Sequence, residues 1–213
     1  MSETRYLYCW FDTEYTTLEL DRAKLLQVAL IVTDDTLRPI QTETSSIDTK
    51  LLRKDGLSMC VAPPPREEMS DHVRDYYQPL LDECDRSGKP VEEVDGQLAA
   101  FMESFPETER EDVRERPIMA GNSIYADAFL ARKYLPRFAS QLNYRMFDVS
   151  TLKLEWLFHY RKDRFRKLNQ AENIQKYYRG EDPIAGAKHD AYYDIQASMA
   201  ELAYYRSLTR VES

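Results

Sequence analysis

Residues 6–14, YLYCWFDTE, form an apolar run rich in aromatic side chains that ends in two carboxylates one residue apart. Such a run predicts a buried β-strand. Because side chains alternate across a strand, Asp12 and Glu14 are expected to point to the same face. Two ionised carboxylates beside a core repel each other and lose hydration, so a hard divalent cation such as Mg²⁺ or Mn²⁺ would be a favourable partner. Two simpler interpretations stay open: Asp12 could begin a turn, and Glu14 could be solvated.

Length and composition favour one compact α/β domain over residues 1–213, because 43% of the residues are hydrophobic. No apolar run approaches the roughly 20 residues of a membrane span, and the first five residues show no signal-peptide pattern. Cys9, Cys60 and Cys84 show no CxxC spacing, which favours reduced thiols over disulfides or a zinc site. We therefore expect a cytoplasmic protein without a membrane anchor, with a mitochondrial location left open.

The formal net charge is -8 at pH 7. Proteins that hold long nucleic acids usually carry a basic face, since neutralising phosphates supplies most of that affinity. The charge therefore argues against a general polynucleotide-binding module, but not against a short nucleic-acid substrate held by metal and a pocket. The one basic cluster, residues 161–167, could contact phosphate or form a solvated helix surface.

The first half of the chain predicts strands followed by an insertion. Residues 24–33 and, after a turn at Asp34-Asp35, residues 37–47 are expected to be strands. With the first strand they would form an antiparallel meander. A divergent insertion is expected at about residues 50–116. Within it we predict a surface loop over 50–70 with prolines at 63–65, a helix over 70–85 capped by Ser70, a helix over 91–105, and a solvated charged stretch over 103–116.

Strands and helices alternate in the second half, which suggests parallel crossovers. The expected elements are a strand over 117–123, a helix over 125–134, a strand over 146–149, a helix over 151–159 capped by Ser150, a helical turn over 174–178, a loop over 180–186 and a final helix over 188–208.

Further acidic residues stand at the ends of these elements. Asp127 lies near the start of one helix, and His189 precedes the final helix with Asp194 five residues later. Taken singly, the two aspartates could merely favour helix N-termini, and the histidine could be a capping or loop residue. Together with Asp12 and Glu14, they could supply a two-metal cluster and a base.

This ordered set resembles the DEDDh 3′–5′ exonucleases, and within them the oligoribonucleases match best. The resemblance rests on Asp12-Thr13-Glu14, Asp127, His189-x4-Asp194, the Gly121-Asn122-Ser123-Ile124 turn, YRMFDVSTLK at 144–153 and AELAYYR at 200–206. It covers roughly residues 7–32 and 117–206. It implies a ribonuclease-H-like α/β fold, in which a mixed sheet with three antiparallel first strands has helices on both faces.

The resemblance also implies the activity: hydrolysis of very short RNA, dinucleotides in particular, to 5′-mononucleotides. Two Mg²⁺ or Mn²⁺ ions would be held by the four carboxylates Asp12, Glu14, Asp127 and Asp194. His189 would accept a proton from the attacking water, a role that suits the near-neutral pKa of an unperturbed histidine.

Substrate-binding residues follow from the same resemblance. Leu18 would wedge between the terminal bases, and Tyr144 would stack on a base. Ser123, Arg145 and Ser150 would cap the 5′ phosphate. In the family the Tyr-Arg pair reaches across a dimer interface, which implies a homodimer.

The middle of the chain departs from the family pattern of a tryptophan and a nearby histidine. The nearest echo is Met69-Ser70-Asp71-His72, with Tyr77 close to the expected histidine. Ala128-Phe129 replaces a pair of arginines, and Tyr193 replaces an aspartate beside Asp194. These changes leave the metal ligands intact but bear on how closely the pocket would fit a dinucleotide.

Three other functions stay open at this point. The chain could trim the 3′ ends of longer RNA or DNA. It could be a catalytically silent nucleic-acid-binding protein on the same fold. It could also carry a metal-binding carboxylate cluster without nuclease activity.

Overall fold

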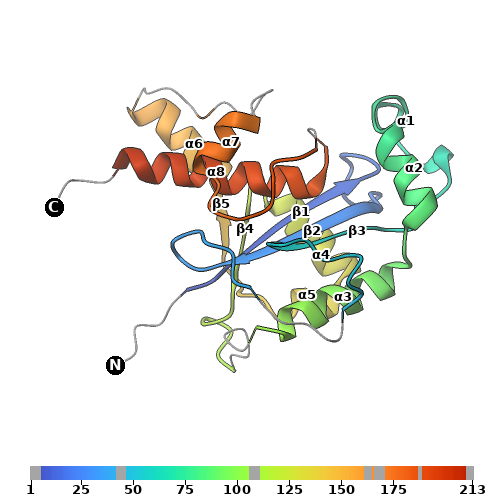
Figure 1. The fold of residues 1–213 in the computed structure, drawn as a ribbon. Helices are drawn as coiled ribbons and strands as arrows, with labels where there is room; N and C mark the ends of the chain where they lie inside the picture. Colours follow the sequence, from blue (N-terminus) through green and yellow to red (C-terminus); the bar gives the residue numbers. More distant parts are fainter. Residues whose placement is uncertain are drawn as a thin grey trace.

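A five-stranded mixed sheet with the strand order β3-β2-β1-β4-β5 forms the centre of the protein (Figure 1). This computed structural model describes residues 6–41, 47–105, 111–160, 165, 171–186 and 189–209. The strands are β1 (Tyr8–Tyr15), β2 (Leu25–Thr33), β3 (Gly56–Cys60), β4 (Ile118–Gly121) and β5 (Met146–Asp148). β1, β2 and β3 are antiparallel, whereas β4 and β5 run parallel to β1. The predicted α/β class and the antiparallel arrangement of the first three strands are confirmed.

Helices cover both faces of the sheet (Figure 1). One face carries α3 (Val91–Glu103), α4 (Tyr125–Tyr134) and α5 (Pro136–Ala139). The other carries α6 (Val149–Glu155), a π-helical turn (Trp156–Tyr160), α7 (Ala171–Tyr177) and α8 (Ala191–Thr209). The alternation of side chains along β1 feeds both cores, because Cys9 and Phe11 pack toward α3 and α4 while Trp10 packs toward α8.

A helical corner joins the end of the sheet through a third, smaller core. It consists of α1 (Asp71–Tyr76) and α2 (Gln78–Ser87) and follows a single 3-10 turn (Arg66–Glu68). Val73 and Leu81 pack there against Leu26 of β2 and Cys60 of β3. The single helix predicted over 70–85 is therefore two helices, which meet at Tyr77 just before a proline at the start of α2.

The prediction of a strand over residues 37–47 is wrong for the residues described there, and residues 42–46 lie outside the described ranges. Its described residues, 37–41 and 47, lie outside the sheet strands, with Leu37 at a φ of 68° and one isolated bridge from Pro39 to Thr33. The third strand is β3, inside the segment that was expected to be a surface loop. It begins with Gly56, where a Cβ atom would overlap the carbonyl oxygen of Leu30 on the neighbouring strand.

The other predicted helices and strands agree in type with the structure, with shifted ends, while residues 106–110 of the predicted charged stretch lie outside the described residues. The predicted cap Ser70 is confirmed, since its side chain accepts a hydrogen bond from the Val73 N–H. Ser150 is not the cap of α6: the cap is Asp148, whose side chain accepts from the Ser150 N–H at 2.8 Å. Of the basic cluster at 161–167, all but residue 165 lie outside the described residues.

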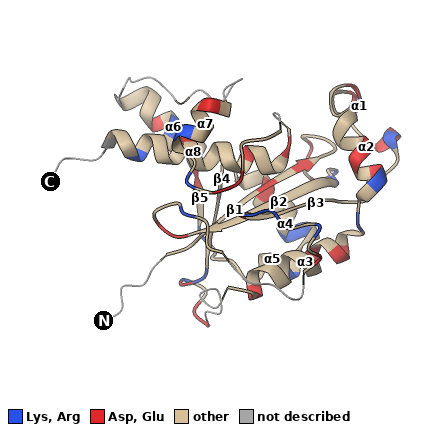
Figure 2. Cartoon of the chain, in the orientation of Figure 1, with Lys and Arg blue, Asp and Glu red and all other residues tan. Residues whose placement is uncertain are grey.

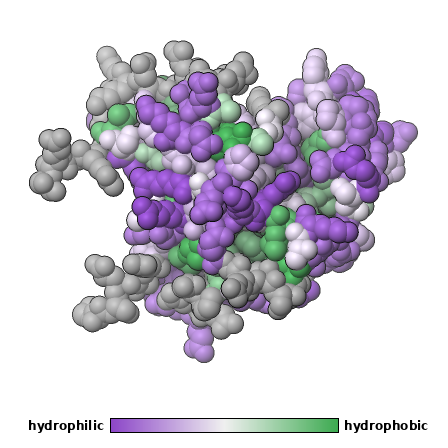
Figure 3. Space-filling model, viewed as in Figure 1, coloured by the Kyte–Doolittle hydropathy of each residue, from purple (hydrophilic) through white to green (hydrophobic). Residues whose placement is uncertain are grey.

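The face of the molecule in Figure 3 is largely hydrophilic, with small apolar patches between polar side chains. Within the ranges that the structure describes, no helix combines the length and the apolar character that crossing a membrane requires.

Candidate active site

A cleft opens at the carboxyl ends of the parallel strands. β4 pairs with β1 only along Tyr8, Cys9 and Trp10, so the last residues of β1 extend past the end of β4. Open α/β sheets bind ligands in such crevices. The cleft has a volume of about 610 Å³ and is walled by β1 and the loop after it, the corner of α1 and α2, the β4–α4 turn and the start of α8.

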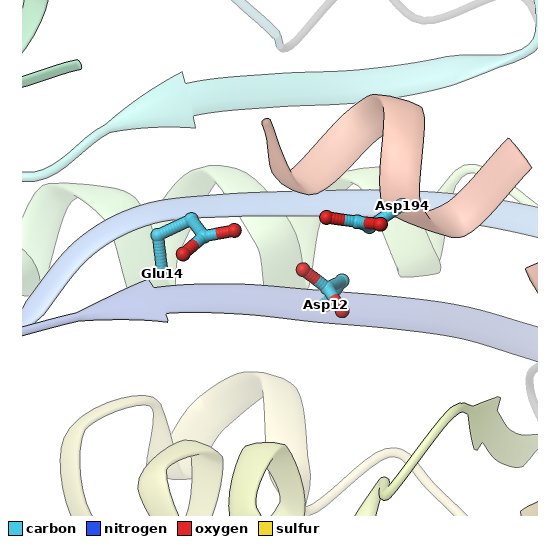
Figure 4. Close-up of side chains that lie close together, drawn as sticks. All are labelled: Asp12, Glu14 and Asp194. Atoms are coloured by element: carbon cyan, nitrogen blue, oxygen red, sulfur yellow. The ribbon is translucent and has the colours of Figure 1, made fainter. Parts of the chain in front are cut away.

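Three carboxylates converge in this cleft (Figure 4). Asp12 and Glu14 come from β1 and Asp194 from the first turn of α8, and one oxygen of each lies within 4.8 Å of the others. Figure 2 shows acidic residues in both elements. Asp12 lies inside a strand and Glu14 is only 8% exposed, so the alternatives of a turn and a solvated side chain are wrong.

The chemistry of these ligand atoms suits a divalent cation. Carboxylates at this spacing repel one another, and a cation between them would remove the repulsion. Oxygen atoms are the ligands that Mg²⁺ and Mn²⁺ prefer. The cluster is therefore an acidic centre of the kind that binds divalent metal.

The fourth predicted carboxylate, Asp127, reaches the cleft from α4 on the opposite face of the sheet. It lines the cleft but is not one of the three clustered groups. Its Oδ1 accepts hydrogen bonds from the N–H of Thr13 at 2.9 Å and from the Thr13 hydroxyl at 2.7 Å. Burial outweighs these hydrogen bonds and raises the pKa of Asp127 to about 7. Thr13, which sequence reasoning passed over, thus ties the fourth carboxylate to the strand that carries the first two.

His189 lies directly beside the carboxylate cluster. It has a left-handed φ of 72°, and its backbone N–H donates to Asp194 Oδ2 at 3.1 Å. The ring nitrogen Nδ1 lies 2.7 Å from the hydroxyl oxygen of Tyr77, and the two rings stack with centroids 4.6 Å apart. The contact with Tyr77 was not predicted, although the sequence places this tyrosine close to the position where the family has a histidine.

Three of the predicted substrate residues are in or next to the cleft. Leu18 stands on its rim with 87% of its surface exposed, and Ser123 lines it. The Ser123 N–H lies 3.0 Å from Ser150 Oγ and 3.0 Å from Asp148 Oδ1, so the two serines form one hydrogen-bonded group. Ser150 also donates to Asn122 at 3.0 Å.

Tyr144 and Arg145 do not reach the cleft of their own chain. Tyr144 lines a separate hollow of about 270 Å³ and is 55% exposed. The Arg145 guanidinium lies 5.0 Å from the centre of the Tyr144 ring, a cation–π distance. Among the described residues that line the cleft there is no lysine or arginine.

Comparison with known proteins finds relatives that are all named as oligoribonucleases or probable oligoribonucleases. The chain is 33% identical to the oligoribonuclease of Nocardia farcinica over 94% of its length and 79% of that protein. It is 30% identical to the oligoribonuclease of Tropheryma whipplei, over 92% of this chain and 90% of that one. A probable oligoribonuclease of Schizosaccharomyces pombe is 29% identical over 97% of this chain and 70% of that one. No protein-family model matches the chain.

Solved structures show the same fold. Exonuclease I from Methylocaldum szegediense superposes with a TM-score of 0.59 at 16% identity, covering 96% of this chain and 41% of that chain. E. coli exonuclease I in complex with a dA16 oligonucleotide has a TM-score of 0.61 at 12% identity and is likewise covered over 41% of its length. The chain thus spans about two fifths of these exonucleases, and the likeness concerns the fold alone.

Proposed function

The chain belongs to the oligoribonuclease family, and from this premise we propose that it is a 3′–5′ exoribonuclease that hydrolyses very short RNA, dinucleotides in particular, to 5′-mononucleotides. The observation that carries the proposal is the meeting of Asp12, Glu14 and Asp194 with His189 in one cleft. Three carboxylates beside a histidine are a constellation for metal-assisted hydrolysis.

We assign metal binding to four carboxylates. Asp12, Glu14 and Asp194 would hold the metal through their clustered oxygens, with Asp127 completing the set from the opposite face. Two bound Mg²⁺ or Mn²⁺ ions would activate the attacking water and stabilise the charge on the attacking and leaving oxygens. Thr13 holds Asp127 in place for this role.

His189 acts as the base. Its Nδ1 is engaged by Tyr77, so Nε2 is the atom that we assign to take the proton. The water oxygen forms a new bond to phosphorus while the bond from phosphorus to the upstream 3′ oxygen breaks. The water proton passes to Nε2, and the leaving 3′ oxygen takes a proton from solvent. The released nucleotide keeps its 5′ phosphate.

The preference for short RNA is supported by the shape and charge of the cleft. Its volume of about 610 Å³ lies in the range of small-ligand pockets rather than of a groove for a long strand. Long nucleic acids are held mainly through cations on their phosphates, and none of the cleft-lining residues in the described ranges is Lys or Arg. The exposed Leu18 on the rim offers an apolar surface to a base.

Recognition of the 5′ phosphate would combine the serines of one protomer with the Tyr-Arg pair of another. Ser123 and Ser150 lie together beside the cleft, whereas Tyr144 and Arg145 are exposed elsewhere. A 5′ phosphate is bound most strongly by a cationic side chain, and none of the described residues that line the cleft is Lys or Arg. A homodimer in which each Arg145 serves the other cleft would supply it.

The remaining parts of the proposal concern organisation and location. Residues 1–213 form a single exonuclease domain, and the divergent segment at about 50–116 supplies the α1–α2 corner that walls the cleft. The cysteines Cys9, Cys60 and Cys84 are buried free thiols, which supports a reducing compartment such as the cytoplasm.

One experiment separates this function from the alternatives. A labelled RNA dinucleotide and a labelled 20-mer are incubated with the protein and Mn²⁺. We expect rapid cleavage of the dinucleotide, slow cleavage of the 20-mer, and loss of both with EDTA. Faster turnover of the 20-mer would favour trimming of longer 3′ ends, and binding without cleavage would favour a silent nucleic-acid-binding protein.

A further inference from the structure

The α1–α2 corner makes a direct contact with His189. Tyr77 is the residue between the two helices, and its hydroxyl oxygen lies 2.7 Å from His189 Nδ1. The two rings are stacked, with centroids 4.6 Å apart and planes at 30°. One tyrosine thus contacts both the face of the imidazole ring and one of its nitrogens, across 112 residues of sequence.

The corner is joined to the sheet by backbone hydrogen bonds and a buried core. Tyr77 donates its backbone N–H to Val73, the last turn of α1, and accepts one from Leu81 in α2. Val73 and Leu81 are 4% and 0% exposed and pack on Leu26 and Cys60 of the sheet. The tyrosine ring is therefore anchored to β2 and β3 through a buried core.

His189 lies outside the helix that carries Asp194. It stands two residues before α8 in a left-handed conformation, which is uncommon for a residue with a side chain. Its backbone N–H is held by Asp194 Oδ2. That bond fixes the main chain but leaves the rotation of the imidazole ring to its side-chain contacts.

We propose that Tyr77 is a positioning residue for His189: its hydroxyl oxygen accepts the Nδ1–H, which holds the ring in place and keeps the Nε2 lone pair for the proton of the attacking water. The inference rests on the proposed function of His189 as the base. It gives the divergent α1–α2 segment a role in the reaction besides walling the cleft.

The direction of the hydrogen bond decides this role. A neutral imidazole carries one N–H and one lone pair, so a donor bound to Nδ1 would place the proton on Nε2 and prevent that atom from acting as a base. With Tyr77 as the acceptor, Nδ1 carries the proton before and after the transfer. The bond can therefore persist through the reaction and stabilise the imidazolium that forms.

The tautomer of His189 is the first test, and it does not depend on activity. The 213-residue chain, labelled with ¹⁵N and loaded with Mg²⁺, contains three histidines. The ring nitrogens of His189 are assigned by their loss in His189→Ala. Long-range ¹H–¹⁵N spectra under conditions in which the ring is neutral should place its proton on Nδ1. A proton on Nε2 would make Tyr77 the donor and would overturn the proposal.

Kinetics of Tyr77→Phe, which keeps the ring and removes the hydroxyl, are the second test. We expect kcat on the dinucleotide to fall about tenfold, the effect of one lost hydrogen bond, with KM little changed. Tyr76→Phe makes the same chemical change one residue earlier on an exposed side chain and should match the wild type. Equal activity of the two variants, at equal melting temperatures, would overturn the proposal.

A double mutant separates positioning from any direct effect on substrate or fold. If Tyr77 acts only through the histidine, adding Tyr77→Phe to His189→Ala should cause no further loss of kcat. A further loss in that background would contradict the inference. Failure of the wild type to cleave any dinucleotide would instead refute the proposed function, while the tautomer experiment would still decide how the Tyr77–His189 hydrogen bond runs.

Discussion

The two walls of the cleft differ in how they are specified. The acidic wall, made of Asp12, Glu14 and Asp194, comes from β1 and α8. The helical wall is the α1–α2 corner, which carries His72 and Tyr77. The first wall is encoded by short spacings within two regular elements, whereas the second depends on a buried core that joins distant segments. The chemistry of the site thus resides in local patterns, and its positioning resides in long-range packing.

Removing a carboxylate from the acidic wall should have the largest effect. We expect Asp12→Ala to lower kcat on the dinucleotide by more than about a thousandfold, because the metal loses a ligand and the transition state loses charge stabilisation. Asp21→Ala, an exposed aspartate in the following loop, is the matched control and should keep full activity. Unchanged activity in Asp12→Ala would mean that the acidic wall is not the catalytic centre.

Substituting Arg145 tests whether a second protomer supplies the cation for the 5′ phosphate that the described residues lining the cleft do not provide. Arg145→Ala should raise KM for a dinucleotide with a 5′ phosphate by about 10- to 100-fold, the range for losing a charge-assisted hydrogen bond. Mixing the inactive Asp12→Ala protein with Arg145→Ala should restore activity, because one site of the mixed dimer then has both residues. A mixture no more active than the sum of its parts, or a monomeric mass by light scattering, would contradict sharing across a dimer.

Metal binding should stabilise the fold through the acidic wall alone. Mg²⁺ or Mn²⁺ at about a hundred times its Kd adds about 2.7 kcal/mol to the free energy of unfolding. For a chain of this length, that raises the melting temperature by about 5–10 °C. The shift should disappear in Asp12→Ala and persist in Tyr77→Phe, as measured by differential scanning fluorimetry. Loss of the shift in Tyr77→Phe would show that the helical wall also supports the metal site.

The acidic wall, which depends on local spacing, could be predicted from the sequence better than the helical wall, which depends on long-range packing. Alternation along β1 predicts that Asp12 and Glu14 share a face, and the short spacing from His189 to Asp194 predicts that the histidine just precedes the helix that carries the aspartate. These features need only the sequence around them. The same alternation would have placed Thr13 on the opposite face, toward α4, but nothing in the spacing indicated that Asp127 bonds to it.

The helical wall and the strand beneath it gave weaker signals. The segment 56–60, GLSMC, has a polar residue in the middle of a short apolar run and precedes three prolines. This pattern favours a loop, although the structure forms β3 there. After β2 the chain turns at Leu37, which has a positive φ, and the described residues 38–41 that follow do not form a strand of the sheet. The contact of Tyr77 with His189 spans 112 residues, and no local pattern encodes such a distance.

Gly56 tests the foundation of the helical wall, with the smallest expected effect. β3 packs under α2 through Cys60, and a Cβ at Gly56 would overlap the Leu30 carbonyl of β2. Gly56→Ala should therefore lower the free energy of unfolding by about 1–3 kcal/mol, the cost of overpacking.

Gly96→Ala is the matched control, since in the interior of α3 its Cβ meets only the flexible Arg137 side chain at 3.4 Å. That change should stabilise the fold by about 0.5–1 kcal/mol in urea titrations. Equal effects of the two substitutions would mean that β3 does not approach β2 as closely at Gly56 as the structure shows.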